Sequence, residues 1–344
     1  MSSFSSLFEP VELVRGQGRP SLSVVIDTEE EFDWAKPHDR NSTATGAIRE
    51  VGRAQDVFDR YALKPCYVID YPIASHTEDH AALREIFQQQ RCVIGTHLHP
   101  WVTPPHEEEV NAYNSFPGNL APELEKKKLA VMTETITENF GCAPICYKAG
   151  RYGVGPQTAQ SLVELGYKVD LSVTPGFDYS PQHGPDYSDA PNLPFWFGPD
   201  RQLFELPCSG GFCGRLGDMS ASVYQAITGE LGMRLKVPGI FARLGLLERI
   251  RLSPEGFTLE EMKRITRYLY KRNVRHFTLS FHSPSLVEGY TPYVSDVDER
   301  QAFIDRIDGY LEFFTSELQG EMTDPESLYR RFLFSRNQEM SDDC

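Results

Sequence analysis

The sequence predicts an α/β protein whose central sheet is built from parallel strands. Short runs of β-branched and apolar residues alternate along the chain with longer amphipathic segments, and 40% of the residues are hydrophobic. Such alternation is typical of βα units, in which each helix returns the chain so that the next strand runs parallel to the last. The length of 344 residues also lies in the range of a single α/β barrel that carries insertions.

The first strand is the run that ends at Asp27, in which Leu22, Val24, Val25 and Ile26 are apolar enough for burial on both faces. The later strands are shorter runs of the same kind. Strands are expected at 21–27, 66–69, 92–96, 145–148, 167–171, 203–206 and 275–281.

The helices are predicted from apolar periodicity and from residues that start or stop a helix. In the earliest one, Ile48, Val51 and Phe58 fall near a period of 3.6 residues. Gly141 ends a long amphipathic segment, and Pro156 begins the next one. Helices are expected at 45–63, 78–90, 122–140, 156–166, 219–235, 258–271 and 296–318.

We expect one domain, residues 21–320, between a polar N-terminal arm at 1–20 and a C-terminal helix and tail at 321–344. Residues 174–202 are dense in Pro, Gly, Asp and Tyr, which indicates a long ordered loop over the site, because its aromatic side chains need burial. Residues 218–251 are expected to form an inserted helical segment.

Charge and composition narrow the function classes. A formal net charge of -15 argues against a nucleic-acid partner, since phosphate contacts need clustered Lys and Arg. The sequence shows no secretion signal and no run long enough to span a membrane, and its seven cysteines are scattered, so a reducing cytoplasm is the expected location. Residues 234–251 are locally basic, which leaves two readings: a helix packed on the barrel, or a contact with the inner membrane surface and a lipid-linked substrate.

Acids follow the first strand directly, at Asp27, Glu29, Glu30 and Glu31. A strand that ends in acids places negative charge at the mouth of a barrel, where it can face a metal or a substrate. The alternative is a solvated acidic turn.

Two histidines end a later strand, at His97 and His99. Residues two apart on a strand face the same way, so both imidazoles can reach one Zn²⁺-like ion. The alternative is a core histidine next to a loop histidine.

Two more strand ends carry polar side chains. Lys148, Arg151 and Tyr152 follow one strand in a glycine-flanked turn, where cations and backbone N–H groups could hold the acids or a substrate oxygen. A structural ion pair of Arg151 is the alternative there. His282 ends the last strand, where a capping or core role is equally open.

Taken together, these strand ends resemble the polysaccharide deacetylases of the NodB-homology group, carbohydrate esterase family 4, over about residues 22–286. The likeness is greatest to the WalW-type branch, linked to bacterial surface-polysaccharide synthesis, in the stretches DTEEEFDW, GTHLHPW, KAGRYG and SFHSPSL. The resemblance implies an irregular (β/α)7 barrel of the TIM-like kind. It also implies a metal-dependent hydrolase that removes an N-acyl group, expected to be N-acetyl, from an amino sugar or polysaccharide.

The resemblance assigns roles to individual residues. It makes Asp27 the catalytic base and His282 the catalytic acid, and it makes Glu29, His97 and His99 the ligands of one divalent ion, Zn²⁺ with Co²⁺ or Ni²⁺ as alternatives. Substrate and oxyanion contacts fall to Lys148, Arg151, Tyr152 and Trp101. Further aromatic residues suit either stacking on sugar rings or the core: Trp34, Phe177, Tyr179, Tyr187 and Trp196.

The sequence departs from the family pattern at several points. The usual pair of adjacent aspartates is replaced by one aspartate and two glutamates, so Glu30 stays an alternative to Glu29. The two histidines are two apart rather than four, and Lys148 stands where the family has arginine. The aspartate that orients the histidine acid is represented by two candidates, Asp170 and Asp178. These departures leave three alternatives open: a deformylase of a lipid-linked sugar, a cyclic-amide hydrolase on the same scaffold, or a glycan-binding protein without activity.

Overall fold

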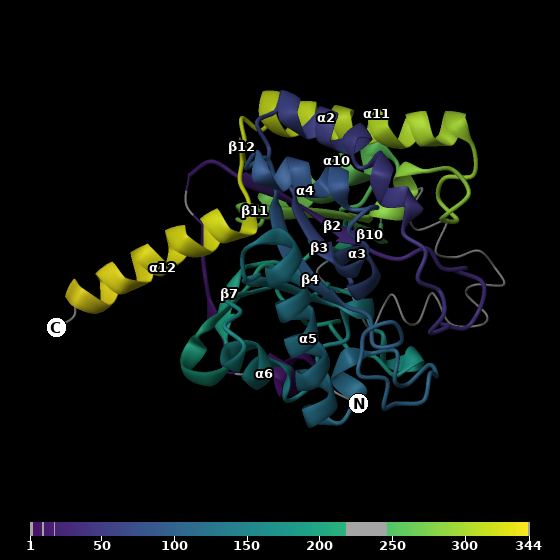
Figure 1. Cartoon of the computed structure of the whole chain (residues 1–344). Coiled ribbons are helices and arrows are strands. Elements are labelled where there is room, and N and C mark those ends of the chain that lie inside the picture. The colour runs from purple at the N-terminus through teal and green to yellow at the C-terminus, as the bar shows by residue number, and fades with distance from the viewer. Residues whose placement is uncertain (1–2, 9, 17, 218–245, 343–344) are drawn as a thin grey trace, which may run out of the picture.

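A computed structural model describes residues 3–8, 10–16, 18–217 and 246–342 (Figure 1). Within them, seven parallel strands follow one another in the spatial order β8-β6-β5-β4-β3-β2-β11. Their bounds are β2 Ser21–Thr28, β3 Cys66–Ile69, β4 Val93–Leu98, β5 Cys146–Ala149, β6 Val169–Asp170, β8 Leu203–Glu205 and β11 His276–His282. The α/β fold with a parallel sheet that the sequence predicts is confirmed.

Shorter strands extend this sheet. β7 (Phe195–Phe197) runs antiparallel to β8, β1 (Glu12–Leu13) pairs with β7, and β12 (Glu321–Met322) pairs with β2. β9 (Gly210–Cys213) and β10 (Glu248–Arg251) form a separate antiparallel pair.

Irregular backbone joins the two ends of the parallel array. The N–H of Ser209, after β8, donates to the carbonyl of Thr278 on β11 at 3.2 Å. The N–H of Ser280 on β11 donates to the carbonyl of Leu252, after β10, also at 3.2 Å. The array therefore curves round so that β8 and β11 approach each other through two connecting segments, which agrees with an irregular barrel.

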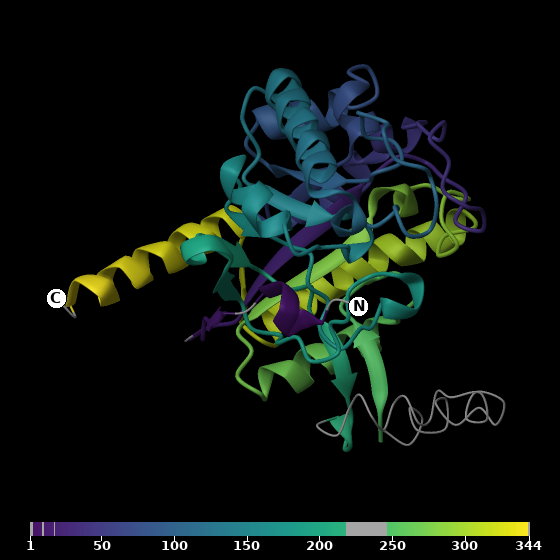
Figure 2. The same ribbon diagram turned by 90° about the horizontal axis from the view of Figure 1, so that it is seen from below.

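Helices lie outside the strands, with α2, α4, α10 and α11 along one part of the sheet and α5 and α6 along another (Figure 1), while α12 projects from the body in both views (Figure 2). Their bounds are α1 Phe4–Phe8, α2 Gly52–Arg60, α3 Tyr71–Ser75, α4 Ala81–Gln88, α5 Pro122–Phe140, α6 Thr158–Glu164, α10 Leu259–Tyr270, α11 Val297–Ser316 and α12 Pro325–Asp342. Local sequence sets several ends: Thr258 and Glu261 form a capping box at α10, Asp296 caps α11, and Gly141 ends α5 with φ 81°. Among the described helices, none is both long enough and apolar enough to cross a bilayer.

The core explains why β2 is apolar throughout. All eight residues of β2 are buried, and alternate side chains enter two different clusters. Leu22 and Ile26 pack with the helices, whereas Val25 belongs to a second cluster on the opposite face of the strand. The helix α12 adds Leu328 to this second cluster. Asp27 is two residues beyond Val25 on the same strand face, so the second cluster leads to the predicted site.

Some predicted elements need correction. The polar N-terminal arm also contributes to the core and the sheet, because Phe8 is buried and β1 pairs with β7. The loop 174–202 contains the strand β7, and the helical segment 218–251 ends in the strand β10. Residues 218–245 of that segment, including the helix expected at 219–235 and most of the basic stretch, lie outside the described residues.

Candidate active site

The carboxyl ends of the parallel strands bring the predicted side chains to one pocket of about 470 Å³. Strand register contributes directly, since His282 on β11 lies beside Asp27 on β2, and His97 on β4 lies beside Lys148 on β5. The pocket is lined by Asp27, Glu29, Phe32, Trp34, Lys36, His38, His97, His99, Trp101, Phe116, Ala149, Arg151, Tyr152, Tyr179, Gln182, Arg251, His282 and Tyr293.

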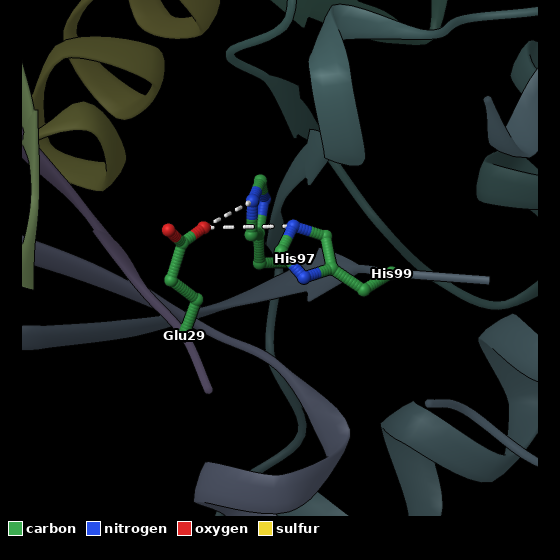
Figure 3. A group of neighbouring side chains, drawn as sticks. All are labelled: Glu29, His97 and His99. Carbon is green, nitrogen blue, oxygen red and sulfur yellow. Dashed lines mark ion pairs between the residues drawn. The ribbon is translucent and has the colours of Figure 1, made fainter. Parts of the chain in front are cut away.

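Glu29, His97 and His99 form a buried cluster suited to a metal ion (Figure 3). Glu29 Oε2 lies 3.7 Å from His97 Nε2 and 3.5 Å from His99 Nε2. The other carboxylate oxygen, Oε1, is buried without a hydrogen-bond partner. Burial raises the pKa of Glu29 to about 7, although nearby histidines oppose the rise, and burial lowers the pKa of His99 to about 4. Two neutral imidazoles and an under-satisfied carboxylate are a donor set that Zn²⁺, Co²⁺ or Ni²⁺ accepts.

Hydrogen bonds on the far side of each imidazole fix its orientation. His97 Nδ1 donates to the backbone carbonyl of Lys148 at 3.0 Å, and His99 Nδ1 donates to Glu30 Oε2 at 2.8 Å. Both Nε2 atoms are thereby left without a proton and free to bind a cation.

Glu30, the alternative metal ligand, lies behind His99. Its second oxygen, Oε1, accepts from Trp101 Nε1 at 2.7 Å, and its backbone N–H donates to Asp70 at 2.7 Å. Glu30, Asp70 and His99 are also close enough together to bind an ion. Glu30, however, meets His99 at Nδ1, whereas Glu29 faces the Nε2 atoms of both histidines. The geometry therefore favours Glu29 as the ligand and Glu30 as the residue that orients His99.

Asp27 forms a buried ion pair with Lys148, whose Nζ donates to Oδ1 at 2.6 Å and to Oδ2 at 2.8 Å. Burial alone would raise the pKa of Asp27, but the charges of Lys148, His97 and His282 outweigh it and lower the pKa to about 2. Asp27 is consequently ionised at neutral pH, with His282 Nε2 3.7 Å from its Oδ2.

Glu255 orients His282, a role that no pattern in the sequence predicted. Its Oε2 accepts from His282 Nδ1 at 2.8 Å, while its Oε1 accepts from the His282 N–H at 3.0 Å and from the Ser285 hydroxyl at 2.6 Å. Burial would lower the pKa of His282, but Glu255, Glu29 and Asp27 raise it to about 9. His282 is therefore cationic at neutral pH, as a proton donor must be.

Neither aspartate predicted to orient His282 contacts it. Asp170 accepts hydrogen bonds from the N–H of Leu171 and the hydroxyl of Ser172. Asp178 accepts from the N–H of Ser180 within its own loop. Both predictions were wrong, because Glu255 reaches the site from the turn after β10, a segment with no strand-end pattern.

The turn after β5 carries unusual backbone. Arg151 and Tyr152 both adopt positive φ, 55° and 61°. Residues other than glycine rarely adopt this conformation, and where they do it is often at a functional site. The Arg151 guanidinium stacks 4.1 Å from the centre of the Phe116 ring and donates to Gln182 Oε1 at 2.8 Å. Arg151 has no carboxylate partner among the described residues, so the structural ion pair considered for it is not formed there.

The aromatic candidates divide between the pocket and the core. Trp101 stacks on His99 with ring centres 4.3 Å apart, and Trp34 meets His282 edge-on at 5.0 Å. Tyr179 lines the pocket and stacks on Tyr152 at 5.3 Å. Trp196 instead is buried and packs against Phe204 and Tyr329, and it does not line the pocket, so it belongs to the core. Tyr187 and Phe177 are not among the lining residues.

Solved structures provide the comparison with known proteins. The sequence matches no protein-family model and no functionally curated protein. A protein described as a polysaccharide deacetylase from Mycobacterium smegmatis superposes with a TM-score of 0.54 at 14% identity, covering 94% of this chain and 96% of that one. The chain shares the polysaccharide deacetylase fold. A second protein described as a polysaccharide deacetylase, from Pseudomonas aeruginosa, superposes with a TM-score of 0.52 at 15% identity, covering 90% of this chain and 89% of that one. PuuE allantoinase superposes with a TM-score of 0.50 at 15% identity and the same coverage of each chain.

Proposed function

We propose that this protein is a metal-dependent amide hydrolase that removes an acyl group, in the first instance acetyl, from the nitrogen of an amino sugar or polysaccharide. The observation that carries the proposal is the Glu29, His97 and His99 cluster in one pocket with an ionised Asp27 and a cationic His282. The deacetylase fold supports it, and the WalW-type assignment stays a prediction.

A divalent ion held by Glu29, His97 and His99 would polarise the acyl carbonyl and acidify water, so that a carboxylate as weakly basic as Asp27 can accept its proton. Lys148 keeps Asp27 ionised and fixes both of its oxygens. The resting state therefore holds the base ready, with no proton to remove first.

The acid half of the reaction belongs to His282. An amine anion is too poor a leaving group, so the departing nitrogen must receive a proton, and the imidazolium of His282 supplies it. Glu255 holds the ring by Nδ1 and leaves Nε2 toward the pocket. The N–H of Tyr152, in the strained turn, is the proposed contact for the developing oxyanion.

A substrate panel tests the proposal. We expect acetate release from N-acetylglucosamine oligomers, measured enzymatically, and slower release or none from the matched O-acetyl sugars. The similarity to an allantoinase favours cyclic-amide hydrolysis as the second candidate, so the panel includes allantoin, and an N-formylated sugar tests deformylation. Turnover of allantoin alone would replace the sugar deacetylase by the cyclic-amide hydrolase, and no turnover of any amide would refute both.

Glu255→Gln should shift the alkaline limb of the kcat/KM profile to lower pH. Activity needs protonated His282, so it falls as the pH rises through the pKa of His282, which is about 9. Removing the negative charge of Glu255 destabilises the imidazolium, lowers that pKa, and moves the limb down by roughly one to two pH units. Glu260→Gln is the matched control, since Glu260 is exposed on the neighbouring helix α10. If the alkaline limb of the profile does not move, Glu255 does not raise the pKa of the proton donor.

A further inference from the structure

Arg251, at the end of β10, lines the same pocket and has no part in the proposed hydrolysis. Its Nη1 donates to the Tyr152 hydroxyl at 2.9 Å, and its Nη2 donates to the Tyr179 hydroxyl at 2.6 Å. Two hydroxyls from different segments thus hold the guanidinium in one orientation. A planar fork fixed in this way is suited to recognising a planar or tetrahedral oxyanion.

Within the described residues, no ion pair balances the charge of Arg251. Among residues 3–217 and 246–342 as far as they are described, no carboxylate forms an ion pair with Arg251, and its Nε is buried without a hydrogen-bond partner. Two other cations at the pocket differ, because buried Lys148 is paired with Asp27 and part-buried His282 is paired with Glu255. A desolvated cation without a counter-charge is costly, and a ligand that brings the negative charge removes that cost.

Aromatic rings compensate only part of this charge. The guanidinium carbon lies 4.8 Å from the centre of the Tyr152 ring and 4.5 Å from that of Phe177. Such contacts stabilise a cation less than an ion pair in a desolvated site does.

The position of Arg251 relates it to the reacting end of the pocket. Lys148 Nζ also lies against the Tyr152 ring, 5.1 Å from its centre, and Lys148 holds Asp27. The Tyr152 ring therefore separates Arg251 from Lys148, which is the partner of the proposed base. Arg151, the other guanidinium on the pocket wall, bonds Gln182 on the loop that carries Tyr179. Cationic side chains thus border the pocket on the side of Tyr152 and Tyr179.

We propose that the pocket selects an anionic sugar, in which a carboxylate or phosphate group is bound by the Arg251 guanidinium while a neighbouring acylamino group faces Glu29, His97 and His99. This inference rests on the proposed function for the acylamino part. The anion-binding part stands on Arg251 alone and can be tested without any hydrolysis.

Three monosaccharides without an amide serve as probes: glucose, glucuronic acid and glucose 6-phosphate. Binding to the full-length protein is measured by NMR titration, and none of the probes can be deacetylated. We expect one or both anionic probes to bind about tenfold more tightly than glucose. Preference for glucuronic acid would indicate an acidic sugar as the natural substrate, and preference for glucose 6-phosphate a phosphorylated one.

Arg251→Gln should remove this preference and leave glucose binding unchanged. Arg251→Lys keeps the charge but loses the planar guanidinium, so it should retain a few-fold preference for the anionic probes. This variant replaces Arg251→Gln in the test if the glutamine variant does not fold. Arg249→Gln is the matched control, because Arg249 stands two residues earlier on β10 and stacks on the same Phe177 ring without lining the pocket. Equal binding of glucose and both anions by the wild type, or an undiminished preference in Arg251→Gln, would overturn the inference. Anion preference without turnover of any acylated sugar would instead refute the proposed function and leave this inference standing.

Discussion

Asp27→Asn is expected to lower kcat for amide hydrolysis about 10³-fold, since the substitution removes the ionised carboxylate that is proposed to accept the proton of the attacking water. Asparagine has the same shape but cannot accept the proton of the attacking water. The measurement is acetate release under saturating substrate, with bound metal determined in parallel. Retention of the ion with loss of turnover is the expected combination.

The same substitution should also destabilise the fold, because it leaves Lys148 buried without a counter-charge. Both side chains are almost completely buried, and breaking a buried pair by removing one partner costs about 3–5 kcal/mol of the free energy of unfolding. The double variant Asp27→Asn with Lys148→Met removes both charges. It should recover much of the stability in urea denaturation and none of the activity.

This pair of variants separates two explanations of the activity loss. If the double variant regains stability and stays inactive, the carboxylate itself is needed for the reaction. If it regains activity together with stability, Asp27 holds the fold and some other group is the base. Wild-type turnover in the single variant would rule out Asp27 directly.

The sequence was informative where a residue's position along a strand decides where its side chain points. Asp27, His97, Lys148 and His282 each lie at or near the end of a strand, and parallel strands end at the same edge of the sheet. Strand pattern and residue type were therefore enough to bring these side chains together, and the two-residue spacing from His97 to His99 was enough to place both imidazoles on one side.

The sequence was uninformative where a side chain reaches the site from irregular backbone. Glu255 comes from a turn after β10, and Arg251 from a strand that pairs outside the main sheet, so no periodicity predicted either. The only local pattern near them is the short run of turn residues before the capping box at Thr258, in which Glu255 lies. The interpretation of Trp196 as a sugar-stacking residue was wrong for the converse reason. A tryptophan in a polar loop suggests a binding surface, but Trp196 belongs to a short strand covered by α12.

Metal removal should abolish turnover, and the wild-type protein should hold one divalent ion per chain by elemental analysis. Prolonged treatment with a chelator should lower activity at least about 100-fold, and addition of Zn²⁺, Co²⁺ or Ni²⁺ should restore it, since imidazole and carboxylate ligands accept all three. His97→Ala should lose the ion, because Glu29 and His99 alone leave the coordination incomplete. His183→Ala is the control, since His183 is exposed and does not line the pocket.

The two adjacent glutamates should respond differently to the same substitution. Glu29→Gln replaces a carboxylate that faces both Nε2 atoms and should weaken metal binding by more than about 100-fold, whereas Glu30→Gln only alters the partner of His99 Nδ1 and should weaken it about 10- to 100-fold. Affinity for Zn²⁺ is measured by competition with a chromogenic chelator. If Glu30→Gln loses the ion completely while Glu29→Gln keeps it, the ion belongs instead to the group formed by Glu30, Asp70 and His99. The reacting carbonyl would then have to approach from the Nδ1 side of His99, where Trp101 already donates to the second oxygen of Glu30. In that case the proposal that Asp27 is the base would also be wrong.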